Sequence, residues 1–347
     1  KVFFVWHELG AASIQSAFVS KLTSPPLLFF FLGAFATFAR SDLDVPNPVA
    51  RAVSLYLLFA IGFKGGVALS TSPFSSDVLV ALGAALVLAS VVPIYVFFIV
   101  TRFFASADAA ALAATYGSIS AVTFVTATNY LDGLGIVWGG HFVAAMALME
   151  APAIVVGLFL YRRAARGSDT GEDAEATSMS QLLREAFLNG SVILILGSLV
   201  IGWLNGEEGM KQLEPFVKAP FVGMLCLFLL DMGLVAARRI RDINDPRTSD
   251  RSVSALAMAS LAIAFALLNG SVALGLGTLA GLPEGDALLL SILGASASYI
   301  AVPAAMRLAL PAANPGIYLT MALAITFPFN IIIGIPLFHY LIRLMGS

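Results

Sequence analysis

The sequence has few charged residues, a single cysteine and no surplus of basic groups. Only 12% of its 347 residues are charged and 59% are hydrophobic, with a mean hydropathy of +0.92. Soluble domains carry about 25% charged residues, so an ordinary water-soluble protein is excluded. Cys226 alone forms no internal disulfide and no thiolate metal site. With 19 basic against 21 acidic residues, the chain is not expected to bind nucleic acid.

Recognisable enzyme motifs are also missing. The sequence contains no GxSxG elbow, no HExxH pair and no Walker phosphate loop, and its three histidines lie far apart. We therefore expect no enzyme activity, no resident cofactor and no ATP-driven pump. An ion gradient remains as an energy source, since one charge crossing 100 mV releases about 2.3 kcal/mol.

Long apolar runs, in contrast, are abundant. A helix that crosses the hydrocarbon layer needs about 20 apolar residues. Ten such runs lie between polar segments, near 24–40, 50–70, 78–103, 107–129, 138–161, 184–204, 218–237, 252–279, 286–309 and 315–343. The sequence predicts an all-α polytopic membrane protein with ten transmembrane helices.

The basic residues are distributed unevenly among the predicted loops. Thirteen of the 19 lie in the loops of one face, and most of these fall in 162–184 and 238–251. Positive charge is retained on the cytoplasmic side, which predicts that both termini are extracytoplasmic. The polar segment 161–183 is typical of a mobile cytoplasmic linker, and it would separate residues 1–160 from residues 184–347.

The two parts of the chain carry similar segments at nearly constant spacing. The matches have offsets of 171, 175 and 178 residues and join Gly62 to Gly233, Met146 to Met321 and Ser120 to Ser298. Each part holds five predicted spans, and because five is odd, the second part would be inverted relative to the first. Inverted repeats are typical of secondary transporters, whose substrate sites lie on interrupted helices.

The fourth and ninth predicted spans combine small and hydroxyl-bearing residues at mid-depth. These are Gly117, Ser118, Ser120 and Thr123 in one span, and Ser296 and Ser298, followed by Pro303, in the other. We expect both helices to be interrupted here, so that half-helix N-termini and hydroxyl groups bind a small anion or a cation. Close helix packing by small residues is the alternative for either patch alone.

Four further polar side chains are predicted inside spans. A carboxylate at the depth of Glu150 costs at least about 2.5 kcal/mol, so Glu150 should be paired, protonated or bound to a cation. Lys64 has three open interpretations: it attracts an anion, pairs with Glu150 or extends to the interface. Tyr299 and Asn330 are candidate ligands, with packing hydrogen bonds as the alternative.

The motifs taken together resemble the sodium-dependent bicarbonate transporters first known from cyanobacteria. The resemblance runs through nearly the whole chain and includes Ile61-Gly-Phe-Lys-Gly-Gly66, Gly117-Ser-Ile-Ser-Ala-Val-Thr123 and Met149-Glu-Ala-Pro-Ala153. It is most specific in the ninth and tenth spans, which carry Ala295-Ser-Ala-Ser298 and Leu310-Pro-Ala-Ala-Asn-Pro-Gly-Ile-Tyr318.

This resemblance implies a homotrimeric ten-helix symporter of two inverted repeats that imports bicarbonate with Na⁺ across the bacterial inner membrane. It also implies a PII-like regulatory protein on the cytoplasmic face. By motif match, the resemblance assigns the binding of the anion and sodium to Gly117, Ser120, Thr123, Ser296 and Ser298. From their positions in the same spans, we add Ser118 and Tyr299 as candidate substrate residues. For ion binding or coupling, the resemblance places Glu150 where the family has an aspartate, and Ser120 and Ser298 are shared with the anion site. Asn330 and Lys64 are further candidates from their positions inside spans.

Two residues depart from the cyanobacterial pattern. Tyr299 stands where that pattern has an aspartate after the ninth-span serines, and Lys64 stands where it is neutral. Three alternatives therefore stay open beside bicarbonate symport: a carrier of another small anion, a Na⁺/H⁺ exchanger that uses Glu150, and a non-transporting sensor or scaffold.

Overall fold

The computed structural model of the chain describes residues 24–71, 76–165, 190–243 and 254–346. Within these ranges the regular structure is helical and contains no strand. Seven helical segments there are long and apolar enough to cross a membrane. These helices confirm the predicted class of all-α polytopic membrane protein. The other predicted spans correspond to a shorter helix, to broken helices or to segments that are only partly described.

The helices of the first part of the chain lie in the expected places. They are α2 (Pro25–Phe38), α3 (Asn47–Thr71), α4 (Ser76–Val100), α5 (Ser106–Gly117), α6 (Ala121–Asp132) and α7 (His141–Ala165). Because α7 continues to Ala165, it includes the first residues of the predicted linker 161–183. The rest of that linker lies outside the described residues.

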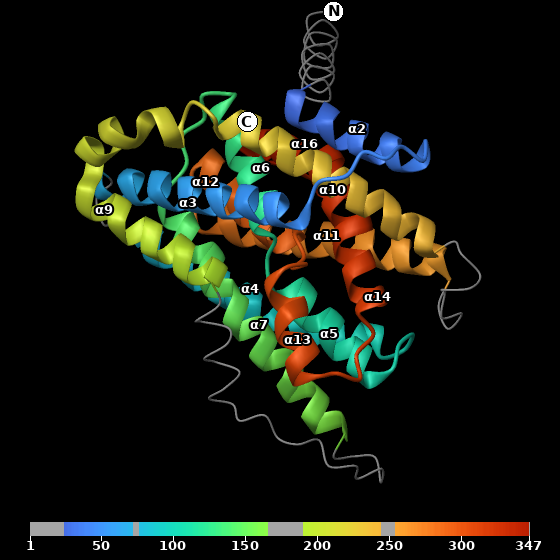
Figure 1. Cartoon of the computed structure of the whole chain (residues 1–347). Coiled ribbons are helices and arrows are strands. Elements are labelled where there is room, and N and C mark those ends of the chain that lie inside the picture. Colours follow the sequence, from blue (N-terminus) through green and yellow to red (C-terminus); the bar gives the residue numbers. More distant parts are fainter. Residues whose placement is uncertain (1–23, 72–75, 166–189, 244–253, 347) are drawn as a thin grey trace, which may run out of the picture.

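The second part has the same general plan with more irregular helices. Its elements are α9 (Gly190–Val217), α10 (Phe221–Ile243), α11 (Ala255–Leu279), α12 (Glu284–Ala295), α13 (Ala301–Ala309), α14 (Pro315–Leu319), η1 (Thr320–Thr326), α15 (Phe327–Phe329), η2 (Asn330–Gly334) and α16 (Ile335–Gly346). The last five elements form one continuous path that alternates between α-helical and π-helical turns (Figure 1). Inside α9, Gly206 has a φ of 54°, and the helix bends there.

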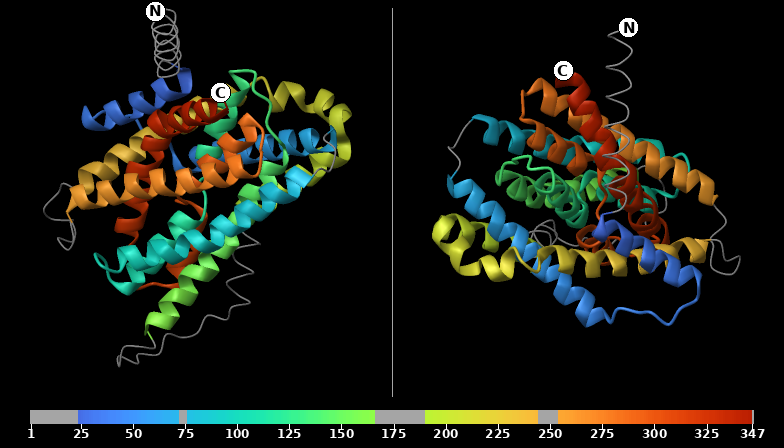
Figure 2. Two further views of the ribbon diagram at one scale, coloured as in Figure 1. Left: turned by 180° about the vertical axis from the view of Figure 1, so that it is seen from behind. Right: turned by 90° about the horizontal axis from the view of Figure 1, so that it is seen from above.

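Two helix pairs along the bundle are in backbone contact. α3 packs along α9, and α2 packs along α10 (Figures 1 and 2). A Cβ atom on Gly233 of α10 would lie 2.0 Å from the carbonyl oxygen of Phe30, and one on Gly66 of α3 would lie 2.0 Å from that of Leu199. Glycine is therefore required for these distances, as in small-residue contacts between membrane helices.

The remaining long helices form a second group. α4 packs against α5 and α7, and α11 packs against α12, η1 and α16. Large apolar side chains stay exposed on the outer helices, including Phe35 of α2, Leu79 of α4 and Leu279 of α11. Extensive apolar surface is unusual for a soluble protein but suits a hydrocarbon solvent.

We predict that Gly233→Ala lowers the stability of the protein by about 1–3 kcal/mol, because the added methyl group overpacks the α2–α10 contact. Gly223→Ala in the same helix is the control, since a Cβ atom there would have nothing within 4 Å. The measurement is thermal unfolding of the purified protein in detergent. Equal midpoints for the two variants would contradict the predicted contact.

Candidate functional site

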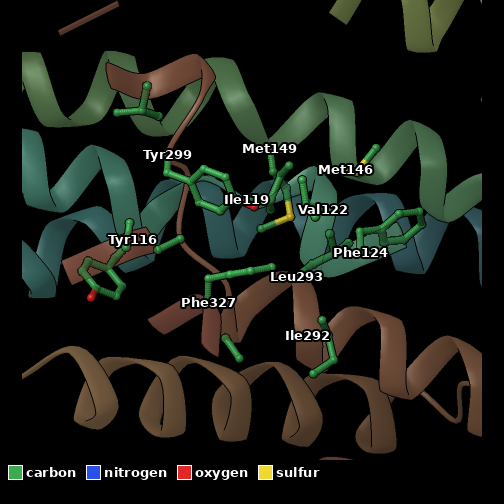
Figure 3. Close-up of a cluster of buried hydrophobic side chains, with 14 of the residues drawn as sticks. Tyr116, Ile119, Val122, Phe124, Met146, Met149, Ile292, Leu293, Tyr299 and Phe327 are labelled. Carbon is green, nitrogen blue, oxygen red and sulfur yellow. The ribbon is translucent and has the colours of Figure 1, made fainter. Parts of the chain in front are cut away.

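Both predicted interruptions are present. The chain leaves the helical conformation between α5 and α6, where Ser118 is extended, and again between α12 and α13, where Ser296 is extended. α5 packs on α13 and α6 packs on α12, so the two breaks meet inside the bundle. Figure 3 shows Tyr116, Ile119 and Tyr299 gathered at this crossing.

Backbone hydrogen bonds hold the two breaks together. The Ser298 N–H donates to the Thr115 carbonyl oxygen at 2.9 Å. The Ser120 N–H donates to Ser296 Oγ at 3.0 Å, and the Ser296 hydroxyl in turn donates to the Leu293 carbonyl at 2.9 Å. Backbone groups that lose their helical partners at one break thus form hydrogen bonds with the other break. Buried backbone groups need such partners, because no water reaches them.

Ser120 and Ser298 act on the half-helices that follow them. Ser120 is the N-cap of α6, and its Oγ accepts from the Thr123 N–H at 3.2 Å. Ser298 Oγ accepts from the Val302 N–H at 3.3 Å in the first turn of α13. Since each hydroxyl accepts from the backbone, its own hydrogen can be donated to an anion. The positive ends of two helix dipoles also lie here.

A small cavity lies at the crossing. Its volume is about 30 Å³, and its lining includes Ser120, Ser298, Tyr299 and Glu150. A single water molecule needs at least about 10–15 Å³ of such space, so the cavity has room for a few atoms only. Its dimensions suit a small ion and exclude a large organic solute.

Several buried oxygen atoms around the crossing have no hydrogen-bond partner among the described residues. They are Thr115 Oγ1, Ser118 Oγ, Thr123 Oγ1, Glu150 Oε2 and Asn330 Oδ1. Buried polar atoms in proteins are nearly always paired with protein or water. Unpaired hydroxyl, carboxylate and amide oxygens are the ligands that a hard cation takes, and the hydroxyl groups can also donate to an anion.

The two ionisable residues singled out from the sequence lie apart. Glu150 of α7 lines the crossing cavity and has no ion pair within the described ranges. Lys64 of α3 instead forms an ion pair with Asp132 at the end of α6, with a distance of 2.9 Å from Nζ to Oδ2. Of the interpretations open for Lys64, pairing with Glu150 is therefore not the arrangement observed.

The other candidates differ in position. Asn330 Nδ2 donates to the Ala295 carbonyl at 2.8 Å, which holds η2 against the end of α12. The Tyr299 ring packs on Phe327, and its buried hydroxyl has no hydrogen-bond partner among the described residues. A Cβ atom on Gly117 would lie 2.2 Å from Cγ of Pro93, so Gly117 serves the packing of α5 on α4.

Sequence reasoning missed two residues that the structure places in these arrangements. Thr115 supplies the carbonyl for Ser298 and an unpaired hydroxyl. Asp132 holds Lys64 and also accepts from the Trp138 indole N–H at 2.9 Å. Thr115 could have been recognised from the sequence, since it lies two residues before Gly117 in the same polar segment. Asp132 could not, because it is 68 residues away from Lys64.

Comparison with known families identifies the superfamily of the chain. A family model of the Na⁺-dependent bicarbonate transporter superfamily matches residues 25–343, nearly the whole chain. The chain belongs to this superfamily. A search of curated proteins gave no match. Membership confirms the predicted resemblance, makes the protein an integral membrane transporter and not an enzyme, and indicates bicarbonate and Na⁺ as transported species.

We predict that Ser296→Ala destabilises the protein by about 1–3 kcal/mol, because it leaves the buried Ser120 N–H without an acceptor. Ser291→Ala is the matched control: its buried hydroxyl only donates to the Ala287 carbonyl of its own helix. Chemical denaturation followed by circular dichroism measures both variants. A Ser296→Ala protein as stable as Ser291→Ala would show that the crossing does not depend on this hydroxyl.

Proposed function

We propose that the protein imports bicarbonate by symport with Na⁺ through alternating access, with both ions bound at the crossing of α5–α6 and α12–α13. The observation that carries the proposal is a cavity of ionic size at the crossing, which is lined by Ser120, Ser298 and the unpaired carboxylate of Glu150. Superfamily membership supplies the chemical identities of the two ions.

The arrangement divides naturally between an anion and a cation. Bicarbonate would accept hydrogen bonds from the hydroxyl groups of Ser120 and Ser298 at the N-terminal ends of α6 and α13. Na⁺ would be bound by unpaired oxygens such as Thr123 Oγ1 and Ser118 Oγ. The Glu150 carboxylate, which lines the crossing cavity, would contribute a negative charge that compensates the cation.

Two features support an inverted repeat of residues 1–160 and 184–347. In the proposed repeat, α2 corresponds to α9, α3 to α10, α4 to α11 and α5 to α12. The contact between α2 and α10 then has its counterpart in the contact between α9 and α3, and the contact between α4 and α5 in that between α11 and α12. At the offset of 178 residues, Thr115 corresponds to Leu293 and Ser120 to Ser298. The Ser298 amide bonds directly to the Thr115 carbonyl, while the Ser120 amide reaches the Leu293 carbonyl through the Ser296 hydroxyl.

The position of the cavity supports alternating access. α2, α3, α9 and α10 form one group of helices, and the helices that include both breaks form the other. The cavity lies between the groups: Ser54 of α3 and Phe228 of α10 line it from one side, and Glu150 and Tyr299 line it from the other. A displacement of one group against the other would open the cavity toward either face.

The remaining expectations belong to this proposal. We propose a homotrimer in the bacterial inner membrane with extracytoplasmic termini and a PII-like regulator on the arginine-rich face. Most of the loops 162–184 and 238–251 lies outside the described residues. A Na⁺/H⁺ exchanger is the second candidate function, since Glu150 is buried in the cavity without an ion pair.

The primary experiment measures uptake of labelled bicarbonate into proteoliposomes. An inward Na⁺ gradient should accelerate uptake, and replacing Na⁺ with K⁺ should abolish the acceleration. Ser120→Ala should reduce the flux, because Ser120 caps α6 and lines the cavity. Uptake that is unchanged in K⁺ would contradict Na⁺ coupling. Na⁺-driven pH change without bicarbonate would favour the exchanger.

Glu150→Gln tests the role of the carboxylate. We expect the Na⁺ concentration for half-maximal uptake to rise by about tenfold or more. A hydrogen bond to a charged group contributes about 1.5–3 kcal/mol of free energy. A loss of about 1.4 kcal/mol lowers a binding affinity tenfold. Glu208→Gln, an exposed position on α9, is the control and should behave as the wild type. An unchanged Na⁺ dependence in Glu150→Gln would remove Glu150 from the cation site.

A further inference from the structure

A second and larger cavity lies beside the crossing. Its volume is about 400 Å³, and its charged lining consists of Lys64, Lys218 and Asp132. Two ammonium groups and one carboxylate leave this lining with a net positive charge. A neighbouring cavity of about 630 Å³ shares these three residues, so the ammonium groups face a wide space and not a closed core.

The large cavity and the crossing cavity lie along the same helices. α3 contributes Leu58 to the crossing cavity and Lys64 to the large one, which places the two about 9 Å apart at 1.5 Å per residue. α6 and α10 also contribute to both cavities. Between the two levels, Ile61 of α3 and Leu225 of α10 are fully buried and apolar. The two cavities thus follow one another along α3, α6 and α10, with apolar side chains of α3 and α10 between them.

The Lys64 ammonium group is held in place, but it donates only one hydrogen bond to the described residues. The ammonium group can donate three hydrogen bonds, and Asp132 accepts one of them. The Phe221 ring lies 4.9 Å from Nζ and supports the cation from another side. The Lys64 side chain is 19% exposed and that of Asp132 is 41% exposed. The Asp132 carboxylate is therefore accessible to water and to an entering anion, whereas Lys64 stays in the cavity wall.

Lys218 supplies the second cation in a looser arrangement. Its partner Glu214 is four residues earlier on α9, at 3.1 Å, and both side chains are about half exposed. Exposed pairs of this kind contribute little net stability. Neither ammonium group is held in a strong pair, so an anion that enters the cavity can replace the carboxylates.

We propose that the Lys64–Lys218 cavity is an anion-capture site, in which a small monovalent anion displaces Asp132 from Lys64 before it moves to the crossing. The proposal rests on the proposed function for the direction of movement and for bicarbonate as the anion. Asp132 acts as an internal competitor that occupies Lys64 when no anion is present. Capture raises the local concentration of the substrate beside the apolar layer.

Trp138 provides a reporter that needs no transport. Its indole N–H donates to Asp132, so displacement of Asp132 changes the surroundings of the ring. In a Trp6→Phe, Trp203→Phe background only this one of the three tryptophans remains. Titration with bicarbonate at constant pH and ionic strength should give a saturable change in fluorescence. Gluconate, which is bulky, should not.

Variants of Lys64 and of its partner make the experiment selective. Lys64→Gln should abolish the fluorescence change and lower kcat/KM for bicarbonate uptake by about tenfold, the lower end of electrostatic effects on association. Lys64→Arg should restore both. Lys211→Gln is the matched control, since this exposed lysine lines only the neighbouring cavity. Asp132→Asn removes the competitor and should lower the bicarbonate concentration for half-maximal uptake.

The outcomes separate this proposal from the proposed function. Wild-type titration and uptake constants in Lys64→Gln would overturn the capture site, even if Na⁺-coupled uptake is confirmed. A fluorescence response that depends on Lys64, in a protein that takes up no bicarbonate, would support anion binding and overturn the transport proposal. If Asp132→Asn weakens uptake as much as Lys64→Gln does, the ion pair is structural and the capture site is wrong.

Discussion

The structure depends on one constraint: two helices are broken inside a layer that offers no water to their backbone groups. Hydrocarbon cannot satisfy a free N–H or C=O group, so each break must be completed by protein. Ser298 takes the carbonyl of Thr115, and Ser120 takes the hydroxyl of Ser296. This mutual pairing fixes α5 against α13 and α6 against α12. The hydroxyl groups of Ser120 and Ser298, which line the cavity, are therefore held in place before any ion arrives.

The placement of charge follows from the same solvent. Glu150 lies at the crossing without an ion pair in the described ranges, which is costly unless a cation or proton joins it. Lys64 and Asp132 lie farther along the helices, where both side chains keep some exposure and their pairing is inexpensive. The bundle thus holds an uncompensated carboxylate inside and an exchangeable ion pair in a wider cavity. In the proposed function, the carboxylate would attract the cation and the lysine would attract the anion.

Much of the fold was predictable because membrane helices leave a strong signal in composition. Apolar runs of sufficient length marked the helices, and hydroxyl-bearing and small residues in two spans marked both interruptions, which the structure shows at 118–120 and 296–300. Of the serine and glutamate candidates, Ser120, Ser298 and Glu150 line one cavity. Two placements escaped prediction. Gly117 packs on Pro93, and Lys64 pairs with Asp132, because both contacts join helices whose relative positions no local pattern encodes.

The sequence by itself determined the class of the protein, the solvent it requires and the family to which it belongs, because composition and motif spacing are local properties of the chain. Only the tertiary structure decided which polar groups share a cavity and which ion pairs form. Those relations join residues such as Thr115 and Ser298, whose bond exists only when two breaks from distant parts of the chain cross. Chemistry at the site is a property of that crossing and not of either segment alone.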